Sequence, residues 1–231
     1  MNILMIYPRY PVTFWSFKYA LKYISKKAAF PPLGLITVAA MLPGEWHVRL
    51  IDLNIEKLRE KDLQWADYVM VSAMLIQKDS VNTILAECNR LRKKIIAGGP
   101  LFTANPEDYV SRVEYLILNE AESTLAAFLE DLKNGTARKI YRSEEFPSLR
   151  NTPLPRWDLV QTKQYANLMI QFSRGCPFNC EFCDVTSLFG HQPRIKTAEQ
   201  FLQELQAIYD TGWRGTVFIV DDNFIGNKKA I

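Results

Sequence analysis

Three of the four cysteines of this 231-residue chain lie close together. Cys176, Cys180 and Cys183 follow the spacing C-x3-C-x2-C in one continuous segment. Three thiolates so near along the chain can ligate three irons of an iron–sulfur cluster, a group that normally takes four cysteines. The remaining cysteine, Cys88, falls on the apolar face of a helical pattern and is predicted to be a core residue. The spacing therefore predicts a [4Fe–4S] cluster with one iron open to a small-molecule ligand.

Zinc is an alternative, because Cys176, Cys180, Cys183 and His191 would make a Cys3His set. Structural zinc sites usually present two short ligand pairs separated by a spacer, however, and not three cysteines on one loop. Unligated thiols are a further alternative. Clustered cysteines in a reducing compartment more often bind metal than form disulfides. The iron–sulfur cluster is therefore the favoured interpretation.

The cysteine spacing, with Phe182 directly before the third cysteine, resembles the motif of the radical S-adenosylmethionine superfamily. The resemblance implies that S-adenosylmethionine chelates the open iron through its amino and carboxylate groups. The cluster would then cleave it to a 5′-deoxyadenosyl radical. It also implies that Phe182 packs near the adenine. Asp221, Asp222 and Asn223 stand where the family frequently has Gly-Gly-Glu, and they are expected to contact the methionine amino group.

Short apolar runs alternate with helical patterns over residues 1–145. Strands are predicted at 2–7, 48–52, 68–72, 95–97 and 115–118, and helices at 33–42, 80–93 and 123–133. Several runs are apolar throughout, as in parallel strands that are covered on both faces. The pattern predicts an α/β domain with a doubly wound parallel sheet of about five strands. Ligands of such sheets bind beyond the carboxyl ends of the strands, where Ser72, Gly98, Gly99 and Glu120 lie.

The α/β domain, a proline-rich linker at 146–160 and the cysteine motif together resemble radical S-adenosylmethionine enzymes with an N-terminal cobalamin-binding domain. The shared features are segment 30–35, Asp52 at a strand end, Gly98-Gly99-Pro100, and Asn119-Glu120-Ala121-Glu122 in place of the usual Gly-Glu-Gly-Glu. The resemblance implies that Ser72, Gly98, Gly99 and Glu120 contact cobalamin. Neither histidine of the chain is placed to ligate cobalt. Cobalamin would therefore bind without a histidine ligand, or the domain has lost it.

A second unit is predicted at 161–231. A strand at 167–173 precedes the cysteines, a capping box of Thr197 and Gln200 opens a helix, and a strand follows at 216–220. Strand, helix and strand make one right-handed βαβ unit. This is the expected start of a radical S-adenosylmethionine partial (β/α) barrel, and the chain is expected to be truncated, a fragment of something longer.

The resemblance implies cobalamin-assisted methyl transfer to an unactivated carbon, with electrons from a donor such as flavodoxin or ferredoxin. Segments 171–177 and 224–229 resemble a branch that includes hopanoid methylases, which suggests a small-molecule or lipid-like substrate. Two alternatives stay open. One is a radical enzyme of another reaction type, whose N-terminal domain is only a scaffold. The other is an inactive truncated chain that binds cofactors.

Composition excludes some classes of function. The net charge of +3 is too small to argue for a nucleic-acid partner, and the local excess of Lys22, Lys26 and Lys27 is interpreted as a solvated helix face. No run reaches the roughly 20 apolar residues of a membrane helix. The N-terminus lacks the features of a signal peptide. A cytoplasmic protein without a transmembrane segment is expected.

Overall fold

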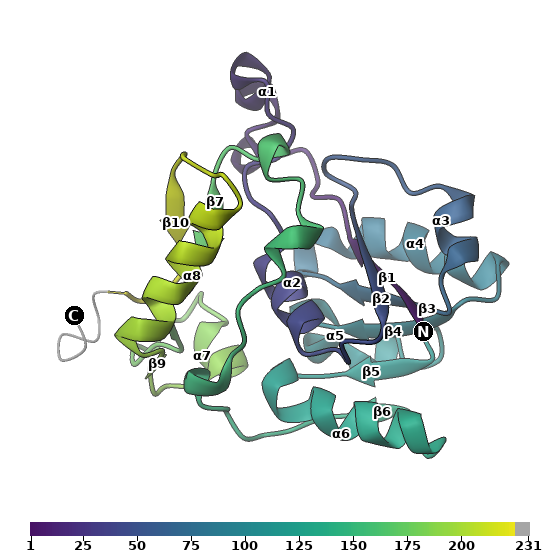
Figure 1. Cartoon of the computed structure of the whole chain (residues 1–231). Helices are drawn as coiled ribbons and strands as arrows, with labels where there is room; N and C mark the ends of the chain where they lie inside the picture. Colours follow the sequence, from purple (N-terminus) through teal and green to yellow (C-terminus); the bar gives the residue numbers. More distant parts are fainter. Residues whose placement is uncertain (225–231) are drawn as a thin grey trace.

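The computed structural model describes residues 1–224. A six-stranded sheet occupies one side of the molecule, and a smaller unit packs beside it (Figure 1). The strands run in the order β2-β1-β3-β4-β5-β6 and every neighbouring pair is parallel. They are β1 (Asn2–Tyr7), β2 (His47–Asp52), β3 (Tyr68–Ser72), β4 (Lys94–Gly98), β5 (Tyr115–Ile117) and β6 (Ile140–Tyr141).

Helices cover both faces of this sheet, so the predicted doubly wound fold is confirmed. Helices α2 (Leu33–Ala40) and α6 (Ala121–Asn134) pack on one face. Helices α3 (Glu60–Trp65), α4 (Lys78–Arg90) and α5 (Pro100–Ala104) pack on the other, where Cys88 is fully buried as predicted. Double coverage explains why residues 3–6 of β1 are all apolar and fully buried.

The smaller unit contains the cysteine segment. Strands β7 (Leu168–Ile170) and β10 (Val217–Ile219) pair in parallel and are joined through α8 (Ala198–Asp210), which gives the predicted βαβ unit. Thr197 Oγ1 accepts from the backbone N of Gln200 at 3.2 Å, and Gln200 Oε1 accepts from the backbone N of Thr197 at 3.0 Å. The capping box therefore forms as expected. The predicted strand 167–173 is divided, because β8 (Ser173–Arg174) leaves β7 to form an antiparallel pair with β9 (Arg194–Ile195). Helix α7 (Val185–Phe189) lies between β8 and β9.

The proline-rich segment packs between the two units. Three short 3-10 turns follow β6, namely η5 (Leu149–Asn151), η6 (Trp157–Leu159) and η7 (Thr162–Gln164). Trp157 and Tyr165 are buried in a third core cluster together with Ile36 of α2, Leu168 of β7 and Ile208 of α8. This cluster joins the large sheet to the βαβ unit.

The remaining short elements lie in loops of the large sheet. They are η1 (Phe14–Ser16), α1 (Lys18–Leu21), η2 (Lys22–Ile24), η3 (Leu75–Gln77) and η4 (Pro106–Asp108). Within residues 1–224, no helix combines the length and apolar composition that crossing a bilayer requires. Most of the segment 224–229 that was compared with hopanoid methylases lies outside the described residues.

Candidate cofactor site

A cavity of about 840 Å³ opens at the carboxyl ends of the large sheet. Ser72 at the end of β3, Gly99 after β4 and Asn119 after β5 line one side of it. Met169 of β7 and Arg174 of β8 line the other side. Its volume lies in the range of small-molecule sites. Its position is where doubly wound sheets bind ligands. The cavity therefore places a ligand between the large sheet and the strand that leads to the cysteines.

The two predicted glycines have different roles. Gly99 lines the cavity with φ of +90°, and a Cβ there would lie 2.6 Å from Ser72 Oγ and 3.3 Å from the backbone N of Ala73. A Cβ on Gly98 would lie 2.8 Å from the backbone O of Ile117 on the neighbouring strand. Gly98 therefore permits strand packing and does not line the cavity, whereas Ser72 and Gly99 form part of its wall.

Asn119 is a polar group of the cavity wall that sequence reasoning did not single out. Its backbone has φ of +64°, and its N donates to Thr103 Oγ1 at 2.9 Å. Its Oδ1 is buried and has no hydrogen-bond partner among the described residues. A buried acceptor without a donor is costly. The Asn119 amide oxygen therefore retains unused hydrogen-bond accepting capacity beside the cavity.

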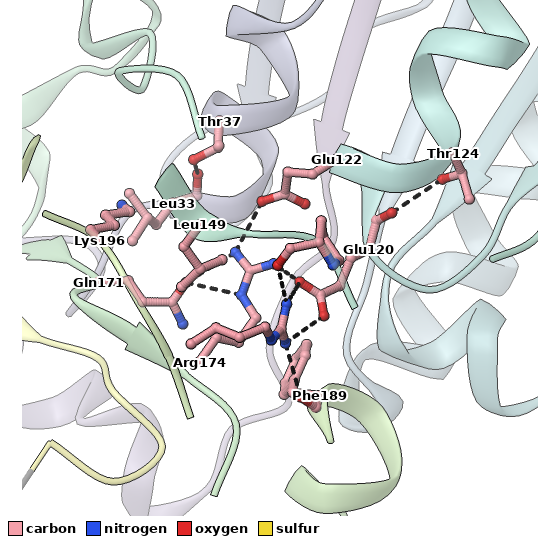
Figure 2. Close-up of polar contacts among 12 residues, drawn as sticks. Leu33, Thr37, Glu120, Glu122, Thr124, Leu149, Gln171, Arg174, Phe189 and Lys196 are labelled. Atoms are coloured by element: carbon pink, nitrogen blue, oxygen red, sulfur yellow. Dashed lines mark hydrogen bonds and ion pairs between the residues drawn. The ribbon is translucent and has the colours of Figure 1, made fainter. Parts of the chain in front are cut away.

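Glu120 links the large sheet to the smaller unit that contains the cysteines. Its carboxylate accepts from Arg174 of β8 and, at 2.7 Å and 2.9 Å, from Arg194 of β9. Arg174 also lies 3.2 Å from Glu122 Oε1 (Figure 2). The exposed fraction of the Glu120 side chain is 3%, against 13% for Arg174 and 14% for Arg194. Burial lowers the pKa of Arg174, but the carboxylates of Glu122 and Glu120 outweigh it and raise the pKa above its usual range.

Asp52 lies at the end of β2, where it is buried. Its Oδ2 accepts from the Tyr165 hydroxyl at 2.8 Å, and its Oδ1 accepts from the backbone N and Nδ2 of Asn54 at 2.8 Å and 2.6 Å. Burial raises the pKa of the Asp52 carboxyl, against the lowering effect of these hydrogen bonds. Asp52 thus holds Tyr165, which follows the linker, and orients Asn54, which lines the cavity.

The cysteine loop leaves β8 through a glycine in the left-handed region of backbone conformation. Gly175 has φ of +94°, and a Cβ there would lie 2.9 Å from the backbone O of Gln192 and 3.0 Å from that of Phe189. The next residue, Cys176, donates its backbone N to Gly190 O at 3.2 Å, and Cys183 donates to Cys180 O at 3.0 Å. A side chain at position 175 would therefore displace the loop from β9 and α7.

Asp221 and Asp222 hold this loop from the end of β10. Asp221 accepts from the backbone N of Phe172 at 2.7 Å and from the N and Oγ of Ser173 at 2.9 Å and 2.7 Å. Asp222 accepts from the backbone N of Gly175 at 2.8 Å. Burial raises the pKa of the Asp222 carboxyl. Sequence reasoning missed this positioning role, because the partners are 47 to 49 residues away along the chain.

The thiols themselves lie at the surface of the loop. Cys180 is exposed, Cys176 and Cys183 are partly exposed, and Asn223 Nδ2 lies 3.5 Å from Cys176 Sγ. The Phe182 side chain is 92% exposed. In residues 1–224, no three His, Cys, Asp or Glu side chains converge on one point that a single metal ion would fill. A four-iron cluster needs three accessible thiolates on separate irons, and this donor set meets that requirement.

The histidines take no part in the cavity. His47 begins β2, at the opposite end of the strand from the cavity, and its side chain is exposed. His191 is exposed between α7 and β9. Neither of them lines the cavity wall.

The chain has similarities to known proteins in both sequence and fold. Residues 24–129 match the family model of the B12 binding domain. The whole chain is 44% identical to an uncharacterized methyltransferase of Synechocystis sp., of which it covers 43%. Over 99% of its length it is 38% identical to the hopanoid C-2 methylase of Rhodopseudomonas palustris, of which it covers 44%. The chain therefore spans less than half the length of these curated relatives.

A solved structure has the same fold at low sequence identity. The radical S-adenosylmethionine methyltransferase TsrM from Kitasatospora setae, with cobalamin and a [4Fe–4S] cluster bound, superposes with a TM-score of 0.66 at 14% identity. The match covers 99% of this chain and 48% of that one. The likeness includes both the large sheet and the cysteine unit.

Proposed function

Because this chain belongs to the radical S-adenosylmethionine superfamily, in the subgroup with an N-terminal cobalamin-binding domain, we propose that it carries the cofactor-binding part of a cobalamin-dependent methyltransferase. Cobalamin occupies the cavity at the carboxyl ends of the sheet. Cys176, Cys180 and Cys183 ligate a [4Fe–4S] cluster, and S-adenosylmethionine binds its open iron. We also propose the division into a cobalamin-binding domain at 1–145, a linker at 146–160 and the start of the barrel at 161–231.

One observation carries this proposal. A cavity large enough for a cofactor is lined on one side by residues at the carboxyl ends of β3, β4 and β5. On the other side it is lined by Met169 and Arg174 of the smaller unit that contains the cysteines. Arg174 stands two residues before Cys176 in the chain. A group bound in the cavity therefore borders the segment that presents the cluster thiolates.

The chain's own residues bind and orient these groups. When bound, the cluster with S-adenosylmethionine supplies a 5′-deoxyadenosyl radical and cobalamin supplies the methyl group for an unactivated carbon. Gly99 keeps the cavity floor open and Asn119 Oδ1 accepts a hydrogen bond from a cobalamin amide. Asp221 and Asp222 fix the loop that carries the thiolates, and Phe182 packs against the adenine. The remaining lone pairs of the two aspartates accept from the methionine amino group.

We propose a small, apolar or lipid-like substrate. Two named relatives support this class, the hopanoid C-2 methylase and the bacteriochlorophyllide d C-8(2)-methyltransferase of Chlorobaculum tepidum, which is 26% identical over 86% of this chain. An electron donor such as flavodoxin or ferredoxin would reduce the cluster. The apolar character of the cavity, which includes Leu33, Val38 and Met41 of the α2 region, is compatible with such a substrate beside the cofactor.

Absorbance titration of the full chain with cobalamin tests the cavity assignment. The wild-type chain is expected to shift the cobalamin spectrum. Asn119→Gly keeps the left-handed backbone possible and removes the amide oxygen, so Kd is expected to rise about 2- to 10-fold. Gly99→Ala places a Cβ against Ser72 Oγ and is expected to weaken binding further. Gly44→Ala is the control, since its Cβ would meet no atom within 4 Å. A wild-type chain that leaves the spectrum unchanged at saturation would contradict the proposal.

A further inference from the structure

The charged side chains of the segment between β1 and α2 are all basic. Residues 8–32 contain five of the chain's 28 basic residues and none of its 25 acidic residues. Aromatic side chains are interleaved with these cations. The basic residues are Arg9, Lys18, Lys22, Lys26 and Lys27. A surface of this composition attracts anions and has no carboxylates of its own to repel them.

The tip of this segment exposes large apolar side chains. Residues 12–24 fold into η1, α1 and η2, and α1 projects away from the body of the molecule (Figure 1). The exposed side chains with their exposed fractions are Tyr23 (92%), Phe14 (81%), Tyr19 (70%), Ile24 (56%) and Val12 (53%). A patch of this kind on a monomer commonly marks an interaction site. The exposure argues that the segment contacts a partner surface.

The charges identify the kind of partner. Lys18 and Lys22 are exposed, and neither forms an ion pair with any residue in the described part of the chain. The Lys22 Nζ lies 5.8 Å from the centre of the Tyr19 ring. Lysines interleaved with aromatic and aliphatic side chains suit the interface of a bilayer, where the rings lie at headgroup level and the cations meet anionic lipids.

The same segment borders the cavity. Tyr10, Val12, Thr13, Ser16 and Lys18 are part of the cavity wall. A surface that receives the tip of the segment would therefore lie near the cavity mouth. This arrangement gives an apolar molecule a short path from a bilayer into the cavity without full exposure to water.

We propose that residues 12–24 are a docking surface for the headgroup region of an anionic lipid bilayer. Binding is peripheral: the aromatic and aliphatic side chains enter the interface, and Lys18 and Lys22 pair with lipid anions. The inference does not depend on the cofactors, since docking uses none of the cysteines and the vesicle measurement needs no bound cobalamin. A failure of docking is therefore distinct from a failure of the cofactor proposal.

Vesicle co-sedimentation of the full chain tests the charge component. Vesicles of phosphatidylcholine mixed with phosphatidylglycerol are expected to bind the chain, and vesicles of phosphatidylcholine alone much less. Each lysine at an anionic surface contributes about fivefold to partitioning, so Lys18→Glu/Lys22→Glu is expected to lower it at least about 25-fold. Lys57→Glu/Lys61→Glu has the same spacing at exposed positions and is the matched control. Equal losses in the two variants would overturn the proposal.

The apolar component has its own pair of variants. Ile24→Ser removes an apolar side chain from the tip and is expected to lower partitioning about tenfold. Leu202→Ser removes a similarly exposed aliphatic side chain from α8 and is expected to leave it unchanged. Circular dichroism checks that each variant stays folded. A wild-type chain that binds neither vesicle would overturn the proposal, and the exposed tip would then be assigned to a protein partner.

Discussion

At the scale of single residues, side chains with unusual environments hold the cavity and the loop in place. Asp52 is an example, since it is buried at the end of β2 and accepts from both Tyr165 and Asn54. Burial raises its pKa in spite of these hydrogen bonds. The carboxyl therefore binds its proton more tightly in the folded chain than in the unfolded one.

This difference gives a signed dependence of stability on pH. Because the folded pKa lies above the ordinary value of 3.8, the native state binds more protons than the unfolded state in the window above that value. The contribution of Asp52 to the free energy of unfolding therefore falls as pH rises from 3.8 through the folded pKa, by at most about 1.4 kcal/mol per pH unit. Urea unfolding of wild type and Asp52→Asn over this range measures it. The stability of wild type relative to the variant should decrease with rising pH, and an increase would contradict the account.

Much at this scale was accessible from sequence and some was not. The positions of Ser72 and Gly99 at the cavity and the burial of Cys88 could be predicted. The end of a parallel strand and a cysteine on an apolar helix face are local signals. The unpartnered oxygen of Asn119 and the hydrogen bonds of Asp221 join distant segments. No local pattern carries that information.

At the scale of elements, the ion network of Glu120, Arg174 and Arg194 joins the end of β5 to the β8–β9 pair. The resemblance implied that Glu120 contacts cobalamin, and this stays a prediction. The structure gives its carboxylate two arginine partners and little exposure. Removing one partner of a buried ion pair leaves an uncompensated buried charge. The free-energy cost of that charge exceeds the net stabilisation that the intact pair contributes.

Glu120→Gln is therefore expected to lower the free energy of unfolding by about 3–5 kcal/mol, since buried Arg194 loses its carboxylate partner and Arg174 keeps only Glu122. Chemical denaturation monitored by circular dichroism measures this. Glu60→Gln is the control, because the pair of Glu60 with Arg90 is solvent-exposed and its loss should change little. A Glu120→Gln variant that keeps its stability but loses cobalamin affinity would assign Glu120 to cofactor contact instead of positioning.

Elements were predicted well where their apolar runs were long. The expected bounds of β1 and β3 agree with the structure, because both strands are covered on both faces. Strand β6 and the pair β8–β9 have two residues per strand, too few for a periodic signal. The antiparallel pair also joins segments on the two sides of the cysteine loop, which no local pattern reports.

At the scale of the whole molecule, three core clusters make one continuous body out of the large sheet, the linker and the βαβ unit. The cavity lies where these parts meet. The solved structure of TsrM has the same fold over 99% of this chain. The composition and the strand–helix pattern predicted both units. The packing of the linker through Trp157 was not predictable, because proline-rich segments carry no periodic apolar face.

Electron paramagnetic resonance of the anaerobically reconstituted, reduced chain tests the central claim most directly. The account predicts a [4Fe–4S]⁺ signal that changes when S-adenosylmethionine is added, because one iron is left open by the three cysteines. It also predicts that Cys180→Ala abolishes the signal, whereas Cys88→Ala retains it. A signal that is indifferent to S-adenosylmethionine, or a reconstituted chain that holds zinc instead, would contradict the account.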